Sequence, residues 1–397
     1  MAELKVITDP REWQEYCISL GRGHSASWRT GGNIAAPGPG SSMEPGPGSS
    51  IGPEPGSSIE PTPVAPGGHN PHPLRAGVSG SGSSSPALRG LPSVGFVPTM
   101  GALHPGHASL IRRSLAENEV TLVSIFVNPT QFNDPKDLHD YPRTWDADRA
   151  LLESLGVDAV FLPRAEQMYS RDFRFEVREA GILRAGDDSE LPGDSPAGRR
   201  RTGTGDQGEA QAAPETPASS RQGGGLAGPD NQGPLRLEEP EGSRFSTQLC
   251  GASRPGHFEG VLTVVLKLLV LTAPSRAYFG EKDYQQYLLI CRMAEDFFLP
   301  TEIVPCPVVR ETSGLAMSSR NRLLSPRGLE RARELYPILR GSKDAPRAVR
   351  ELEQLGFQVD YLVDRRDLGP GEPARRFAAV VLEGIRLIDN LVLEEGA

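Results

Sequence analysis

Short β-branched segments alternate with helical segments along most of this sequence, and the alternation constrains the fold more than any other feature. The strand-like segments lie at 4–7, 94–97, 120–127, 159–162, 276–279 and 301–304. One helical segment begins at Asp9, and four others cover 107–118, 146–155, 260–272 and 284–296. Such alternation is typical of βαβ units with right-handed crossovers. We therefore predict an α/β fold built on a parallel sheet.

Two tracts rich in Gly, Pro and polar residues interrupt this pattern, at about 31–90 and about 184–242. Neither has enough large apolar residues to offset an ordering cost of roughly 1–2 kcal/mol per backbone residue. We predict that both are disordered insertions, which loops tolerate because extra length adds little entropy cost. A docking tract for a partner is the alternative interpretation.

The overall composition narrows the class of protein. The chain has 42 Lys and Arg against 51 Asp and Glu, a net charge of −9 that argues against nucleic-acid and anionic-membrane binding. Its four cysteines form no C-x-x-C pair, as in cytosolic proteins with reduced thiols. No apolar run approaches the roughly 20 residues of a spanning helix, and the first residues do not resemble a signal peptide. We expect a cytoplasmic protein with no nucleic-acid or membrane partner.

The segment 98–107, P-T-M-G-A-L-H-P-G-H, follows a predicted strand and precedes a predicted helix. It places His104, His107 and several backbone N–H groups at a helix N-terminus, which favours an anion such as a nucleotide phosphate chain. A metal site and a pair of structural histidines are the alternatives. The chain offers no obvious Cys/His set to complete four zinc ligands.

Polar turns also follow two other predicted strands, N-P-T-Q-F at 128–132 and G-E-K-D-Y-Q-Q at 280–286. Because the carboxyl ends of parallel strands share one edge of a sheet, we expect these turns to meet the 98–107 turn there. Taken alone, G-E-K-D is more typical of a solvated turn. The loop 310–321 adds two hydroxyls and a guanidinium that suit phosphate oxygens. No P-loop motif is present, and no G-x-S-x-G sequence lies between a predicted strand and a predicted helix.

A two-histidine turn followed by a Met-Ser-Ser-Arg loop resembles the signature pair of the HIGH-type nucleotidyltransferases. Within that superfamily the sequence resembles the pantothenate synthetase (pantoate–β-alanine ligase) family much more closely. The matching motifs, in family order, are 98–107, 126–132, 141–144, 254–258, 279–286, 315–321 and 386–390. The resemblance implies a Rossmann-like parallel sheet with helices on both faces over 1–308. It also implies a small C-terminal α+β domain over 309–397 that closes over ATP.

The same resemblance implies an activity. It is the ATP-dependent ligation of (R)-pantoate and β-alanine to pantothenate through a pantoyl adenylate, with release of AMP and pyrophosphate. Mg²⁺ is expected to arrive with ATP, and Asp148 is the candidate protein contact to it. A homodimer is also implied.

The resemblance further assigns roles to individual residues. His104 and His107 contact the ATP phosphates, with His107 as the proton donor to the leaving group. Gln131 and Gln286 bind pantoate, and Gln131 also meets β-alanine. Lys282 holds phosphates, Asp283 holds the ribose and Val309 packs on adenine. The implied ATP-binding set is Met100, Gly101, Ala102, Leu103, His104, Pro105, Gly106, His107, Gly280, Glu281, Lys282, Asp283, Val309, Met317, Ser318, Ser319 and Arg320.

The chain departs from the family pattern in the two long tracts, in Ser313 where an acidic residue is usual, and in a short stretch at 329–360. Two other functions stay open. A different HIGH-type adenylyl- or cytidylyltransferase would share the histidine turn, although Gln131 and Gln286 suit a small hydroxy acid better. An interaction protein on a former enzyme fold is the other, although His104 and His107 are both intact.

Overall fold

The computed structural model describes residues 3–21, 91–180, 182–185, 235–238, 244–369 and 371–393. Most of the two predicted insertions therefore lies outside the described residues. The ends of the second tract are an exception, because Ile182–Ala185 (β5) and Leu235–Glu238 (β6) pair as an antiparallel ladder. The prediction of disorder was wrong for 184–185 and 235–238, since a backbone ladder forms without a hydrophobic run.

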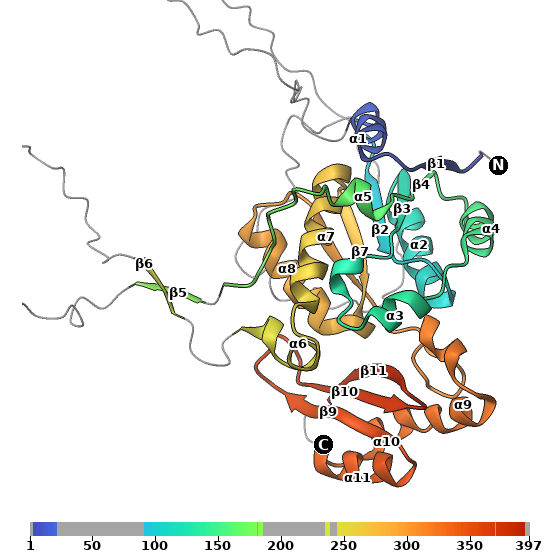
Figure 1. Ribbon diagram of the computed structural model, residues 1–397, viewed down its shortest axis with the longest axis vertical. Helices are drawn as coiled ribbons and strands as arrows, with labels where there is room; N and C mark the ends of the chain where they lie inside the picture. Colours follow the sequence, from blue (N-terminus) through green and yellow to red (C-terminus); the bar gives the residue numbers. More distant parts are fainter. Residues whose placement is uncertain are drawn as a thin grey trace, which may run out of the picture.

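A six-stranded, all-parallel sheet forms the centre of the larger part of the molecule (Figure 1). Its strands, in spatial order, are β1 (Lys5–Ile7), β4 (Ala159–Phe161), β3 (Val120–Ile125), β2 (Val94–Thr99), β7 (Arg276–Gly280) and β8 (Glu302–Cys306). The predicted α/β fold is thus confirmed, and every predicted strand is present with its bounds shifted by at most two residues.

Helices cover both faces of this sheet, as expected (Figure 1). One face carries α1 (Pro10–Ser19), α7 (His257–Thr272) and α8 (Tyr284–Asp296), and the other carries α2 (Pro105–Glu117) and α4 (Trp145–Leu155). Successive side chains of a strand point to opposite faces. Accordingly, Phe96 packs in the core beneath α7 and α8, whereas Val97 packs beneath α2 and α4.

The strand order creates a crevice beside β2. From β2 the chain moves outward to β3 and β4, and it later returns to β7 on the other side of β2. The connections that leave β2 and β7 therefore diverge, and α/β sheets bind ligands at such a switch point beyond the carboxyl ends of the strands. The topology brings together the turns 98–107 and 280–286, which are far apart in sequence.

The C-terminal part is a separate antiparallel sheet with its own helices (Figure 1). Its elements are β9 (Gln358–Arg365), β10 (Arg375–Leu382), β11 (Ile385–Val392), α9 (Pro326–Ala332), α10 (Leu335–Gly341) and α11 (Ala345–Gln354). A hydrophobic cluster that includes Leu335, Leu352 and Val380 fills the space between them. The smaller α+β unit is therefore present, while its exact boundary at 308/309 stays a prediction.

Short helices complete the connections, and α3 lies between the main sheet and the C-terminal unit (Figure 1). They are α3 (Pro135–Asp140), α5 (Ala165–Met168), α6 (Cys250–Ser253) and 3-10 turns at Pro129–Gln131, Phe245–Thr247, Glu281–Asp283 and Ser319–Leu323. Among the described residues, no helix combines the length and apolar character needed to cross a membrane.

Candidate active site

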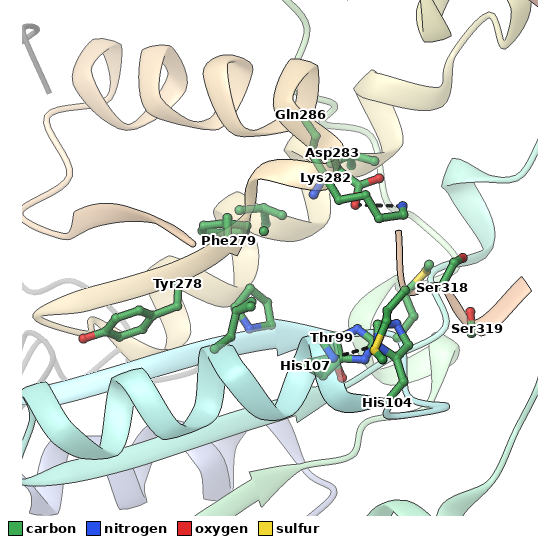
Figure 2. Close-up of a pocket in the computed structure, with 18 of the residues that line it drawn as sticks. Thr99, His104, His107, Tyr278, Phe279, Lys282, Asp283, Gln286, Ser318 and Ser319 are labelled. Atoms are coloured by element: carbon green, nitrogen blue, oxygen red, sulfur yellow. Dashed lines mark hydrogen bonds and ion pairs between the residues drawn. The ribbon is translucent and has the colours of Figure 1, made fainter. Parts of the chain in front are cut away.

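A cavity of about 230 Å³ lies at the switch point between β2 and β7. Figure 2 shows that three separate segments face it: the start of α2 with His104 and His107, the turn after β7 with Lys282 and Asp283, and the loop with Ser318 and Ser319. The convergence expected from parallel-strand geometry is therefore present in the structure.

His104 and His107 lie together at the N-terminus of α2. Their ring centroids are 4.1 Å apart. His104 is the N-cap residue, and its Nδ1 accepts a hydrogen bond from the backbone N–H of Gly106 at 3.1 Å. In a neutral imidazole the proton must then sit on Nε2, which makes that nitrogen a donor. Nδ1 of His107 is buried with no hydrogen-bond partner among the described residues.

Both imidazoles are held in the neutral form. Burial, with Lys282 and Arg322 nearby, lowers the pKa of His104 to about 4. Burial, with His104 and Lys282 nearby, lowers the pKa of His107 to about 3. At neutral pH each neutral ring keeps one N–H group that can donate a hydrogen bond. The role of proton donor that the resemblance implies for His107 stays a prediction.

Asp148, on α4, supports the backbone of the histidine turn. Its two carboxylate oxygens accept hydrogen bonds from the backbone N–H groups of Ala102 (2.9 Å) and Leu103 (2.8 Å), and the hydroxyl of Thr144 donates to it at 3.1 Å. Gly101 and Ala102 have φ of 81° and 48°, in the left-handed region. A Cβ on Gly101 would lie 3.1 Å from Asp148 Oδ2, so the turn and the carboxylate are closely fitted.

This geometry gives Asp148 a task other than the expected contact to Mg²⁺. Its carboxylate is buried and already accepts three hydrogen bonds. Among the residues that the structure describes, no three His, Cys, Asp or Glu side chains are grouped so as to hold a metal ion. A single contact from Asp148 to a Mg²⁺ that arrives with ATP needs no such group, so this contact stays a prediction.

The turn after β7 presents Lys282 and Asp283 to the cavity from the opposite side (Figure 2). Lys282 Nζ lies 3.4 Å from Asp283 Oδ2. Gln286 lines the same cavity from the first turn of α8. Its neighbour Gln285 is buried and bonds to the backbone of 245, 248 and 250, which makes it structural.

The loop with Met317, Ser318 and Ser319 closes one end of the cavity. The hydroxyl of Ser318 caps the following 3-10 turn by accepting from Arg320 N–H at 3.3 Å. Arg320 also donates to both carboxylate oxygens of Asp137 in α3, at 3.2 and 2.9 Å. Part of the positive charge of Arg320 is therefore neutralised within the protein.

Gln131 is fixed from several sides. Its Oε1 accepts from Asn128 at 3.2 Å and its Nε2 donates to Met100 Sδ at 2.8 Å. Its backbone carbonyl accepts from Arg254 (3.1 Å) and lies 2.8 Å from Nδ1 of His257. The 129–131 turn sits directly on α7, where a Cβ at position 260 would lie 2.5 Å from Thr130 O, so glycine is required there.

One wall of the cavity is apolar and comes mainly from α7. The residues that form it are Pro98, Val261, Val264, Val265 and Leu268. The four α7 positions have the spacing of a core-facing helix stripe, and nothing in the sequence distinguishes them from core residues.

A second cavity, of about 100 Å³, adjoins the first and shares Gln131, Lys282 and Gln286 with it. Arg254, Arg320 and Arg386 all line it. Arg386 pairs with Asp360 and Arg320 with Asp137, whereas half-buried Arg254 has no carboxylate partner among the described residues. Burial, together with the charges of Arg320 and Arg386, lowers the pKa of the Arg254 guanidinium.

The structure thus brings most of the expected site residues to the two cavities but not all of them. Those that line the first cavity are Met100, His104, Gly106, His107, Gln131, Gly280, Lys282, Asp283, Gln286, Val309, Met317, Ser318, Ser319 and Arg320. Those at neither cavity wall are Gly101, Ala102, Leu103, Pro105, Glu281 and Asp148. Of these, Ala102 and Leu103 donate backbone hydrogen bonds to Asp148, whereas the backbone N–H of Gly101 donates to the hydroxyl of Thr99. The lining residues without an assigned role include Thr99, Asn128, Tyr141, Arg254 and His257.

Comparison with known proteins decides the family. A family model described as pantoate-beta-alanine ligase matches residues 83–392. The chain belongs to the pantoate–β-alanine ligase family. The expected family and the ligase class are thereby confirmed.

Individual relatives agree with this assignment. The pantothenate synthetase of Bdellovibrio bacteriovorus is 41% identical over 299 residues, which cover 75% of this chain and 91% of that protein. A bifunctional pantoate ligase/cytidylate kinase of Synechococcus elongatus is 43% identical over 321 residues, which cover 76% of this chain and 50% of that protein. The pantoate–β-alanine ligase of Francisella tularensis, solved as a complex with β-γ ATP and β-alanine, is 35% identical with a TM-score of 0.57, covering 76% of this chain and 90% of that one.

Proposed function

We propose that this ligase makes pantothenate in two steps at the described cavity, through a pantoyl adenylate. In the first step a carboxylate oxygen of (R)-pantoate attacks the α-phosphorus of MgATP. The bond from that phosphorus to the bridging oxygen of the β-phosphate breaks, and pyrophosphate leaves. In the second step the amine of β-alanine attacks the acyl carbon, and AMP leaves with the oxygen that pantoate supplied.

One observation carries the proposal: His104, His107, Lys282 and Ser318 face a single cavity at the N-terminus of α2. The ammonium group, the hydroxyl and the helix dipole all favour a phosphate chain. The neutral imidazoles can donate hydrogen bonds to the charge that develops on the phosphates, a stabilisation that needs no proton transfer. Mg²⁺ belongs to the substrate MgATP in this account.

The cavity also suits pantoate. This small acid carries hydroxyl groups, a carboxylate and two methyl groups on one carbon. The amides of Gln131 and Gln286 can bind the polar groups, and the α7 wall with Val261 and Val265 can cover the methyl groups. Such a pocket holds a small hydroxy acid better than the base of a second nucleotide.

The second cavity supports binding of the amine substrate. Arg254 is a half-buried cation without a carboxylate partner among the described residues, so an anionic ligand would offset its desolvation. The carboxylate of β-alanine is such a ligand. Its amine would then point toward Gln131 and the first cavity, where the acyl carbon lies. A cytoplasmic homodimer is also part of the proposal, supported by the family resemblance alone.

The test is turnover by the purified full-length protein. With MgATP, pantoate and β-alanine we expect pantothenate and AMP in equal amounts. With pantoate but without β-alanine we expect exchange of labelled pyrophosphate into ATP. Pyrophosphate exchange that requires a different acceptor, such as a mononucleotide or phosphopantetheine, would favour the alternative function of another HIGH-type nucleotidyltransferase.

A further inference from the structure

Asn390, on β11 of the C-terminal sheet, contacts the backbone of the turn that carries Lys282. Its side-chain Nδ2 donates hydrogen bonds to the carbonyl oxygens of Glu281 and Lys282, both at 2.9 Å. Asn390 is only 2% exposed, so neither bond competes with bulk water. A primary amide has two N–H donors, and both are used on this one turn.

The orientation of Asn390 is fixed by its other contacts. Its Oδ1 accepts from a guanidinium N–H of Arg375 on β10. Because arginine has donors and no acceptor, the oxygen must face Arg375 and the NH₂ group must face the turn. The backbone carbonyl of Asn390 accepts from Arg310 at 3.1 Å. The guanidinium of Arg310 also donates to both carboxylate oxygens of Asp389, at 2.6 and 2.9 Å.

Apart from an ion pair between Glu281 and Arg375 at 3.7 Å, the 281–283 turn has few constraints of its own. It is a single 3-10 turn with no side-chain cap hydrogen bond. Its side chains Lys282 and Asp283 face the cavity. The direction in which Lys282 leaves the backbone therefore depends on what holds the carbonyls of 281 and 282.

We propose that Asn390 is a positioning residue for Lys282. It holds the turn so that the ammonium group faces the phosphate-binding side of the cavity, and it makes the C-terminal sheet a part of the ATP site. This inference rests on the proposed function, because the phosphate-binding role of Lys282 belongs to it.

Asn390→Asp tests the inference with a nearly isosteric change. An acidic side chain still accepts from Arg375, but it presents an oxygen to the two carbonyl oxygens of the turn and removes both donors. We expect kcat/KM for ATP in pantoate-dependent pyrophosphate exchange to fall by about 10- to 100-fold, the range for losing hydrogen bonds to buried groups. We expect KM for β-alanine to stay within about twofold, because Asn390 acts on the ATP side.

A double-mutant cycle with Lys282→Ala separates positioning from general damage. If Asn390 acts through Lys282, Asn390→Asp lowers kcat/KM for ATP in the wild-type background and changes it by less than about twofold in the Lys282→Ala background. If pyrophosphate exchange by Lys282→Ala is too slow to measure, the same four proteins are compared by the dissociation constant for ATP, obtained by titration. Equal losses in both backgrounds would overturn the inference.

Two further variants complete the design. Asn118→Asp is a matched control, because Asn118 Nδ2 also donates two hydrogen bonds, to Ser114 O and Tyr278 Oη, at the far end of α2. It is expected to lose stability but to keep kcat/KM for ATP. If Asn390→Asp does not fold, Asn390→Ala enters the same cycle under the same criterion. Absence of exchange by the wild-type protein would instead contradict the proposed function.

Discussion

Asp148→Asn tests whether the Asp148 carboxylate holds the histidine turn in place. The carboxylate accepts from two backbone N–H groups at 2.9 and 2.8 Å in a buried position. An asparagine keeps one acceptor oxygen and places an NH₂ group against the other N–H donor. One hydrogen bond to a charged group is lost and one buried donor is left without a partner.

The expected cost follows from these contacts. A hydrogen bond to a charged group contributes about 1.5–3 kcal/mol, and an unpaired buried donor costs about 1–3 kcal/mol. Allowing for partial relaxation, we expect the free energy of unfolding to fall by about 2–4 kcal/mol. Because Ala102 is held at a φ of 48°, the turn is expected to relax and displace His104 and His107. A misplacement of about 1 Å can cost about 100-fold in rate.

Urea unfolding gives the stability, and pantoate-dependent pyrophosphate exchange gives the rate of adenylation. Asp158→Asn is the control, because Asp158 Oδ2 also accepts from a backbone N–H, that of Thr121 at 2.7 Å, while Asp158 lines neither cavity. It is expected to lose stability while keeping its exchange rate. If Asp148→Asn changes the free energy of unfolding by less than about 0.5 kcal/mol and exchanges pyrophosphate at the normal rate, the reasoning is refuted. Full rescue of its rate by excess Mg²⁺ would instead identify Asp148 as a metal contact.

Three other predictions follow from the site. Arg254→Met should raise KM for β-alanine at least tenfold, about 1.4 kcal/mol, and leave pyrophosphate exchange within about threefold; an unchanged KM would remove Arg254 from the amine subsite. Gln131→Ala should raise KM for pantoate more than KM for ATP, and steady-state kinetics showing an effect on ATP alone would contradict that assignment. Burial lowers the histidine pKa values, to about 3 for His107, so the unfolded chain binds more protons than the folded one below about pH 6.5. Stability should therefore fall as the pH drops from 6.5 toward 4, and His107→Gln should show a shallower fall in urea titrations at each pH; an identical slope would show that His107 is not buried in its neutral form.

Local sequence patterns were sufficient to predict the main sheet. Asp9 caps α1 by accepting from Arg11 N–H at 2.8 Å with Pro10 in the first turn, as expected from the residue types. Parallel strands also bring the turns after them to one edge, so the meeting of His104 with Lys282 could be expected before any coordinates. These inferences depend on periodicity and topology, which are local or general.

Contacts between distant residues could not be predicted in this way. The carboxylate of Asp148 supports the histidine turn from another helix, and no local signal distinguishes that use from a contact to Mg²⁺. The α7 wall with Val261 and Val265 has the spacing of an ordinary core helix. The motif 386–390 was recognisable only by resemblance, because the hydrogen bonds from Asn390 to the 281–283 turn join residues more than a hundred positions apart.

Transfer of oxygen from pantoate to AMP tests the central claim most directly. Pantoate labelled with ¹⁸O in its carboxylate is incubated with the enzyme, MgATP and β-alanine, and the nucleotide product is analysed by mass spectrometry. An acyl-adenylate route predicts that each AMP carries one labelled oxygen, because the oxygen that attacks the α-phosphorus leaves with it. Label in inorganic phosphate with ADP as the product, or AMP without label, would contradict the account.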